Sequence, residues 1–195
     1  MHKIVILDRD GTINADSDDY IKTADEWQPL PGALEAIARL NHAGWHVVLA
    51  SNQSGLGRGL FDMAALNAMH AKLIKLLAAK GGRVDAIFFC PHSPDEGCNC
   101  RKPLPGLFEQ IAERYGMALD GVHAVGDTLR DLIAAVGVGC VPHLVLTGKD
   151  AGLAAMLQQG LPLPDGYPAG TRVHADLMGF AAWLLAQESR SRAMT

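Results

Sequence analysis

Two kinds of hydrophobic pattern alternate along this chain of 195 residues. Short apolar runs are typical of buried strands, and segments whose apolar residues recur every three or four positions are typical of helices. The runs lie at 4–7, 46–50, 86–89, 121–125 and 143–146. Because strands and helices alternate, the pattern predicts an α/β fold with a parallel sheet covered by helices on both faces.

Residues that start or stop helices place the expected helices between these strands. One helix opens at Pro31-Gly32, and a second begins at Asp62, a residue type suited to cap a helix N-terminus. The apolar face of the second helix is predicted to comprise Leu66, Met69, Leu73, Ile74 and Leu77. Further helices are expected after Pro105, around 129–133 and at 177–186, with an irregular loop at 160–170. No linker divides the chain, so residues 1–195 are expected to form a single domain.

The composition narrows the classes of protein to which the chain can belong. Hydrophobic residues make up 49% and charged residues 19%, which is typical of a globular protein. The net charge of −4 gives no sign of a nucleic-acid or membrane partner, and neither a signal peptide nor a run of ~20 apolar residues is visible. We therefore expect a cytoplasmic monomer whose cysteines are metal ligands or core residues, with Cys140 in the core.

Two carboxylates follow the first predicted strand directly. Asp8 and Asp10 are two positions apart, so they begin on the same side of an extended chain, and Gly11 then allows a sharp turn. Ligands of open α/β sheets bind at the carboxyl ends of the strands. One acid there can hold a divalent cation and attack an electrophile while the other moves protons. Taken alone, the pair is explained as well by solvated loop residues.

Three later segments also place polar side chains near strand ends. Ser51 follows the second strand and can bind an anion, although a polar turn explains it equally well. Arg101 and Lys102 could bind phosphoryl groups, or be a solvated basic pair. Asp127 can complete an oxygen shell for Mg²⁺ or cap a helix, and Asp131 one turn later could support that shell.

The ordered set of four segments resembles the haloacid dehalogenase superfamily. The matching residues run Asp8-x-Asp10-Gly11-Thr12, then Ser51, then Lys102, then Gly126-Asp127-x-x-x-Asp131. The resemblance implies a Rossmann-like three-layer α/β/α core with a minimal cap. It implies a two-step phosphatase in which Asp8 is the nucleophile and Asp10 the acid and base. Magnesium would bind Asp8, the backbone carbonyl of Asp10, and Asp127, while Ser51, the Asn52 backbone and Lys102 would stabilise charge on the phosphoryl group.

A second metal site is predicted in the loop at 90–100. Cys90, His92, Cys98 and Cys100 supply three thiols and an imidazole, which suits tetrahedral zinc. Four protein ligands leave no open position, so the zinc would be structural. The alternative is a loop with free thiols or one disulfide. Because the loop ends at Arg101-Lys102, zinc would position both cations.

The zinc loop resembles two subfamilies of the superfamily, the heptose-bisphosphate phosphatases of ADP-heptose and lipopolysaccharide synthesis and the histidinol-phosphate phosphatases. The stretches Asn52–Phe61 and Arg101–Gly106 resemble the first subfamily. Asn52, Gln53, Arg58 and Arg101 are then expected to bind the substrate, the two arginines meeting the phosphate that is not removed.

Alternatives remain open at this point. The acidic residues of the loop at 15–27, namely Asp16, Asp18, Asp19 and Glu26, would suit the cationic histidinol phosphate, although a solvated loop also explains them. The same loop, with Tyr20 and Ile21, could close over a sugar. A broader sugar-phosphate phosphatase is the third possibility. A non-catalytic zinc-stabilised module would require the loss of Asp8 or Asp10, and both are present.

Overall fold

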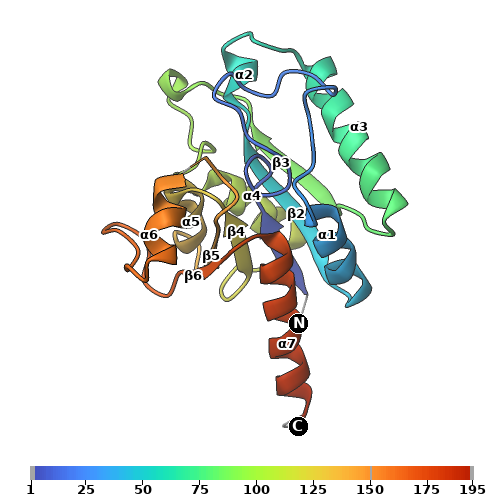
Figure 1. The fold of residues 1–195 in the computed structure, drawn as a ribbon. Coiled ribbons are helices and arrows are strands. Elements are labelled where there is room, and N and C mark those ends of the chain that lie inside the picture. Colours follow the sequence, from blue (N-terminus) through green and yellow to red (C-terminus); the bar gives the residue numbers. More distant parts are fainter. Residues whose placement is uncertain (1–2, 150, 194–195) are drawn as a thin grey trace.

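The computed structural model describes residues 3–149 and 151–193, and its centre is a six-stranded parallel sheet (Figure 1). Its strands are β1 (Ile4–Leu7), β2 (His46–Asn52), β3 (Ala86–Cys90), β4 (His123–Gly126), β5 (Val141–Val145) and β6 (Arg172–His174). They lie in the order β3-β2-β1-β4-β5-β6. The strand order changes direction between β1 and β4, which is where α/β sheets of this kind bind their ligands.

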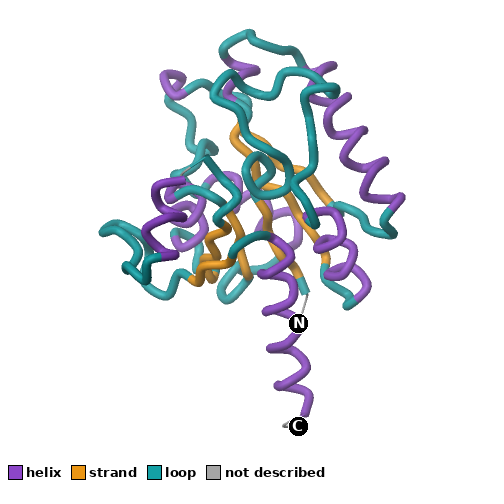
Figure 2. The backbone as a smooth tube through the Cα atoms, in the orientation of Figure 1, coloured by secondary structure: helices purple, strands orange, loops and turns teal. Residues whose placement is uncertain are grey.

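Helices cover both faces of the sheet (Figure 2). They are α1 (Ala33–His42), α2 (Ser54–Gly57), α3 (Met63–Ala79), α4 (Gly106–Tyr115), α5 (Leu129–Val136), α6 (Ala151–Gln158) and α7 (Leu177–Ala193), with a 3-10 turn η1 (Pro94–Glu96). Buried residues of α1, α3 and α7 share one hydrophobic cluster with the sheet, and those of α4 and α5 share another. The three-layer α/β/α prediction is therefore confirmed.

The first strand shows why both layers form. Val5 and Leu7 belong to the cluster under α1, α3 and α7, whereas Ile4 and Ile6 belong to the cluster under α4 and α5. This division follows from the alternation of side chains along a strand. A strand that is buried on both faces needs the continuous apolar run seen in the sequence.

The structure also corrects parts of the predicted pattern. Asp62 caps α3 by accepting a hydrogen bond from the Ala65 N–H at 2.8 Å, as predicted. Ile74, however, is 51% exposed and does not belong to the buried face of α3. The strand β6 and the helix α6 were not predicted; β6 has one apolar residue in three, too few for the apolar run that marks a buried strand. Within the described residues, no helix is long and apolar enough to cross a membrane.

Three histidines form a hydrogen-bonded row beneath α7. His123 Nδ1 lies 2.9 Å from His143 Nε2, and His143 Nδ1 lies 3.0 Å from His174 Nε2. They come from β4, β5 and β6, and the rings of Phe180 and Trp183 on α7 pack against them. Burial lowers the pKa of all three, that of His143 to about 2 with further contributions from neighbouring positive charge, and that of His174 to about 4.

This row predicts a loss of stability in mild acid. A base whose pKa is lowered by folding stabilises the native state above its ordinary pKa of 6.5 and loses that contribution as the pH falls. His143 contributes a slope of about 1.4 kcal/mol per pH unit to the free energy of unfolding below pH 6.5. Urea unfolding between pH 7 and pH 5 should therefore show a shallower pH dependence for His143→Gln than for the wild type. Parallel curves for the two proteins would contradict this role.

Candidate active site

Asp8 stands at the carboxyl end of β1, where β1 and β4 are neighbours. The backbone N–H of Asp8 donates to the Val125 carbonyl at 2.8 Å, which extends the sheet pairing by one residue and fixes the direction of the side chain. The carboxylate lines a cavity, and Asp8 Oδ1 accepts a hydrogen bond from Lys102 Nζ at 2.8 Å. One oxygen of Asp8 is thus held in place by a cation.

Lys102 is a buried cation surrounded by oxygen atoms. Its side chain is 2% exposed, and its Nζ contacts Asp131 Oδ1 at 2.7 Å and the Ala50 carbonyl at 2.7 Å as well as Asp8. Asn52 binds both backbone groups of Lys102, the N–H at 3.1 Å and the carbonyl at 3.0 Å. Although burial acts to lower it, the charges of Asp131 and Asp8 hold the pKa of Lys102 above its ordinary value.

Three carboxylates converge around this lysine. Asp8, Asp127 and Asp131 each place an oxygen atom within 4.8 Å of the others. A methyl group on Gly11 would lie 2.3 Å from Asp127 Oδ2, and one on Gly148 would lie 2.1 Å from it, so the backbone encloses Asp127 tightly. Oxygen ligands from a few carboxylates are those that Mg²⁺ prefers, so the cluster suits this ion.

Burial and mutual repulsion make two of these carboxylates harder to ionise. Burial raises the pKa of Asp8 to about 7, with Asp131 adding to the effect and Lys102 opposing it. Burial likewise raises the pKa of Asp127 to about 8, with Asp8 and Asp131 adding to it.

The N-cap residue of α5 is Thr128, not Asp127. Asp131 completes this cap, because its carboxylate accepts a hydrogen bond from the Thr128 N–H at 3.0 Å. Asp127 is therefore left to face the cluster.

Asp10 lines the cavity beside Asp8 but is bound by other side chains. Its oxygens accept hydrogen bonds from Arg9 Nη2 at 2.9 Å, Gln53 Nε2 at 2.8 Å and Asn14 Nδ2 at 2.8 Å. Although burial acts to raise it, the Arg9 guanidinium and these hydrogen bonds hold the pKa of Asp10 below its usual range. Gln53 Nε2 also donates to Ser51 Oγ at 2.6 Å, so the amide connects the first and second segments.

The loop at 90–100 brings its four candidate metal ligands together. The sulfurs of Cys90 and Cys98 are 3.6 Å apart, and Cys100 Sγ lies 3.2 Å from Cys90 Sγ and 3.3 Å from His92 Nδ1. Four ligands at zinc distances from a common centre are separated from one another by roughly 3.5–3.8 Å. The spacing fits a tetrahedral metal and is too long for a disulfide, and all four cysteines of the chain are free. Cys140 lies in the core, as predicted.

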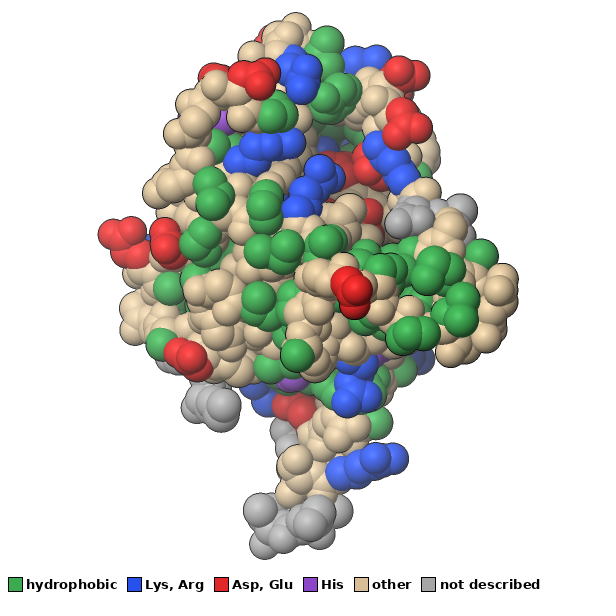
Figure 3. All heavy atoms as spheres, turned by 90° about the vertical axis from the view of Figure 1, so that its left-hand side faces the viewer, with side chains coloured by type: hydrophobic (Ala, Val, Ile, Leu, Met, Phe, Trp, Pro, Cys, Tyr) green, Lys and Arg blue, Asp and Glu red, His purple; other side chains and the backbone are tan. Residues whose placement is uncertain are grey.

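A cavity of about 200 Å³ opens beside Asp8, Asp10 and Lys102. Figure 3 shows Lys and Arg side chains gathered around a hollow in which acidic side chains are visible. Arg101 and Lys102 line the cavity, together with Asp8, Asp10, Asn52 and Gln53. Arg58 does not line it; this arginine is the C-cap of α2 and is exposed. Ser51 is 2% exposed and is not among the residues that line the cavity.

The cavity also includes residues that sequence reasoning missed. Arg9, Arg130 and Lys149 line it, and Arg9 is buried, with its side chain bound to Asp10. The place of Lys149 in the site could have been predicted from the sequence. Thr147-Gly148-Lys149 follows the fifth predicted strand, just as the other polar segments follow theirs. Arg9 gave no signal, because an arginine between two acids in a loop is usually exposed.

Comparison with known proteins identifies the family. A model of the haloacid dehalogenase-like hydrolases matches residues 3–139. The chain belongs to this family. A D-glycero-beta-D-manno-heptose-1,7-bisphosphate 7-phosphatase of Bordetella bronchiseptica is 58% identical over 183 residues, which cover 94% of this chain and 98% of the relative. The phosphatase of the same name from Pseudomonas aeruginosa is 54% identical over 93% of this chain and 97% of its own length.

Solved structures agree with the fold. The crystal structure of the B. bronchiseptica D,D-heptose 1,7-bisphosphate phosphatase, complexed with magnesium and phosphate, matches with a TM-score of 0.87 over 95% of this chain and 99% of that one. An L-2-haloacid dehalogenase from Xanthobacter autotrophicus matches with a TM-score of 0.62 at 16% identity, which shows a shared fold alone.

Proposed function

We propose that this hydrolase is a D-glycero-β-D-manno-heptose 1,7-bisphosphate 7-phosphatase. The observation that carries the proposal is the 58% identity with the B. bronchiseptica phosphatase over nearly the full length of both chains. The cavity supports it, because two acids face a lysine and an arginine there, as hydrolysis of an anionic phosphate ester requires. The comparisons support the heptose substrate over histidinol phosphate.

In this proposal the two acids act in two steps. A carboxylate oxygen of Asp8 attacks phosphorus while the bond from phosphorus to the C7 oxygen breaks, which leaves an aspartyl phosphate. Asp10 gives the C7 oxygen a proton and then removes a proton from the water that attacks phosphorus. Phosphate leaves and Asp8 is restored. The hydrogen bonds from Arg9 and Gln53 favour ionised Asp10, the form that the second step requires. The first step requires protonated Asp10, a form that the negative charge of a phosphate ester bound beside it would favour.

The side chains fit two different metal ions. Asp8 and Asp127, with the backbone carbonyl of Asp10, would hold Mg²⁺, which would neutralise charge on the phosphoryl oxygens. Asp131 would orient Lys102 beside that ion. The thiol-rich set of Cys90, His92, Cys98 and Cys100 would hold structural zinc.

The direct test measures phosphate release with Mg²⁺ from both anomers of the heptose bisphosphate and from histidinol phosphate. The proposal predicts a strong preference for the β anomer. Preference for histidinol phosphate would contradict it. Slow and equal turnover of all three substrates would contradict a dedicated heptose phosphatase and favour the broader enzyme. That the chain acts as a cytoplasmic monomer of one domain stays a prediction.

Arg101 and Arg58 offer a matched pair of variants. Arg101 lines the cavity, so Arg101→Ala should raise KM for the bisphosphate about 10–100-fold, the cost of losing a charge-assisted hydrogen bond. Arg58 is exposed outside the cavity, so Arg58→Ala should change KM less than about twofold. Steady-state kinetics with the bisphosphate and with a simple monophosphate measure both. Equal losses on the two substrates would refute a role of Arg101 in binding the second phosphate.

A further inference from the structure

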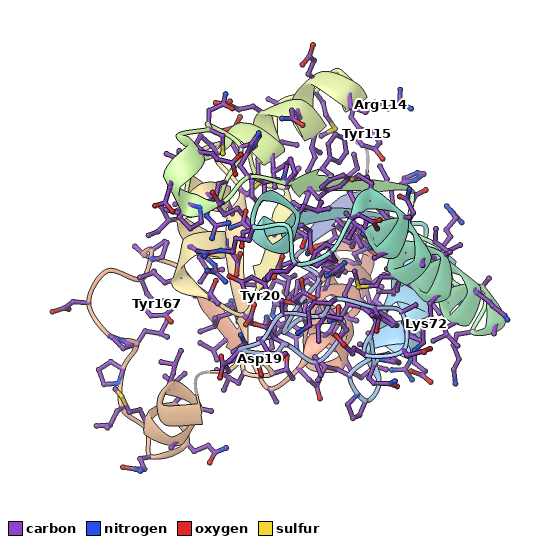
Figure 4. All side chains as sticks on the ribbon, turned by 90° about the horizontal axis from the view of Figure 1, so that it is seen from above. Asp19, Tyr20, Lys72, Arg114, Tyr115 and Tyr167 are labelled. Atoms are coloured by element: carbon purple, nitrogen blue, oxygen red, sulfur yellow. The ribbon has the colours of Figure 1, made fainter. Side chains whose placement is uncertain are left out.

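The acidic loop at 15–27 forms one wall of the cavity. Asp16, Ser17, Asp18, Tyr20 and Ile21 line it, and Tyr20 has a left-handed backbone with φ of 65°. Seen from above, Asp19 and Tyr20 lie between Tyr167 on one side and Lys72 on the other (Figure 4). Among the described residues no separate domain covers the cavity, so this wall bounds the space that a substrate can occupy.

Lys149, in the segment that follows β5, binds this wall. Lys149 Nζ donates to the Ser17 carbonyl at 2.7 Å and pairs with Asp16 Oδ2 and Asp18 Oδ1, each at 3.1 Å. Individual exposed ion pairs contribute little, but here a single ammonium group binds three oxygens from consecutive residues. Lys149 therefore restrains 16–18 as a unit.

The segment that carries Lys149 is itself firmly placed. Thr147 Oγ1 donates to the Gly11 carbonyl at 2.7 Å, and Gly148 packs so closely against Asp127 that a methyl group would not fit. Lys149 therefore follows two residues that are held in place beside the acid cluster. The other half of the loop has its own restraint, because Lys72 Nζ donates to the carbonyls of Ala24 and Trp27 at 2.7 Å each.

We propose that Lys149 is a specificity-determining positioning residue that holds 16–18 as the wall of the sugar-phosphate site, an inference that rests on the proposed function. Lys149 also changes the electrostatic potential of the cavity. Asp16 and Asp18 face a cavity that receives a polyanion, and the ammonium group of Lys149 neutralises part of their repulsion. Both effects act on substrate binding and leave the reacting groups in place.

The test compares Lys149→Met with Lys149→Arg and with Lys80→Met, which removes an exposed lysine paired with Glu35 outside the cavity. Lys149→Met should raise KM about five- to tenfold with kcat within about twofold of wild type, while Lys149→Arg should recover most of the loss. Lys80→Met should match the wild type. KM is measured with whichever of the two heptose anomers and histidinol phosphate the wild type prefers, so a wrong substrate assignment is recognised separately.

Hydrogen exchange of the free enzyme provides a readout that needs no substrate. The amide of Tyr20, which donates to the Ser17 carbonyl at 3.2 Å, and its neighbours at 17–21 should exchange faster in Lys149→Met, while the amide of Trp27 keeps the wild-type rate. Unchanged exchange at 17–21 would overturn the restraint. Faster exchange with an unchanged KM would overturn the role in specificity, and so would a fall in kcat as large as the rise in KM.

Discussion

Asp8→Asn is expected to abolish phosphate release while leaving the fold intact. The amide cannot attack phosphorus, so kcat should fall by more than about 10³-fold, the scale of losing a nucleophile. Asn keeps an oxygen that can accept the hydrogen bond from Lys102 Nζ, now 2.8 Å from Asp8 Oδ1. Phosphate release with Mg²⁺ measures the effect. Activity within tenfold of the wild type would exclude Asp8 as the nucleophile.

The same substitution should stabilise the protein when metal is removed. An acid whose pKa is raised by folding destabilises the native state as the pH rises above its unfolded value of 3.8, and burial raises the pKa of Asp8 to about 7. In Mg²⁺-free buffer at pH 8, Asp8→Asn should therefore melt at a higher temperature than the wild type, and the difference should shrink at pH 5. Thermal melting without and with Mg²⁺ checks this; an equal or lower melting temperature at pH 8 without Mg²⁺ would contradict the electrostatic account.

Cys98→Ser should cost the protein its zinc and most of its activity, yet the sheet should still form. The cluster fixes a loop that ends at Arg101 and Lys102, both of which line the cavity. Loss of such positioning typically lowers activity about 10–100-fold. Lys102 keeps its two backbone hydrogen bonds to Asn52, so some activity should remain.

Cys140→Ala is the matched control, because Cys140 is a buried thiol outside the zinc loop. This variant should retain zinc and wild-type kcat. Metal analysis, circular dichroism and kinetics on both variants separate loss of metal from loss of fold. Cys98→Ser protein without zinc but with normal activity would refute the coupling between the two sites.

The sequence predicted those parts of the fold and of the site that follow from a single physical rule. Continuous apolar runs predicted strands buried on both faces, and the carboxyl ends of parallel strands meet at one edge, which brought Asp8, Ser51 and Asp127 into one region. The zinc ligands were predictable because their types and spacing are local. The same rule, applied after β5, would also have found Lys149.

Other features depended on contacts that no local pattern specifies. Arg58 and Arg101 are both cations near predicted site residues, but α2 turns the chain so that Arg58 ends exposed at its C-cap. Arg9 is buried with its guanidinium bound to Asp10 and Gln53, contacts that only the folded chain brings together. Ile74 fits the helical spacing of its neighbours, yet its side chain is 51% exposed in the structure.

The most direct test of the central claim traps the covalent intermediate on the protein. Wild-type enzyme turning over the heptose bisphosphate with Mg²⁺ is quenched in acid and treated with borohydride, which reduces an aspartyl phosphate to homoserine. Peptide mass spectrometry then locates the change. The account predicts homoserine at position 8 in the wild type and none in Asp8→Asn. Homoserine at Asp10 or Asp127, in place of position 8, would contradict it.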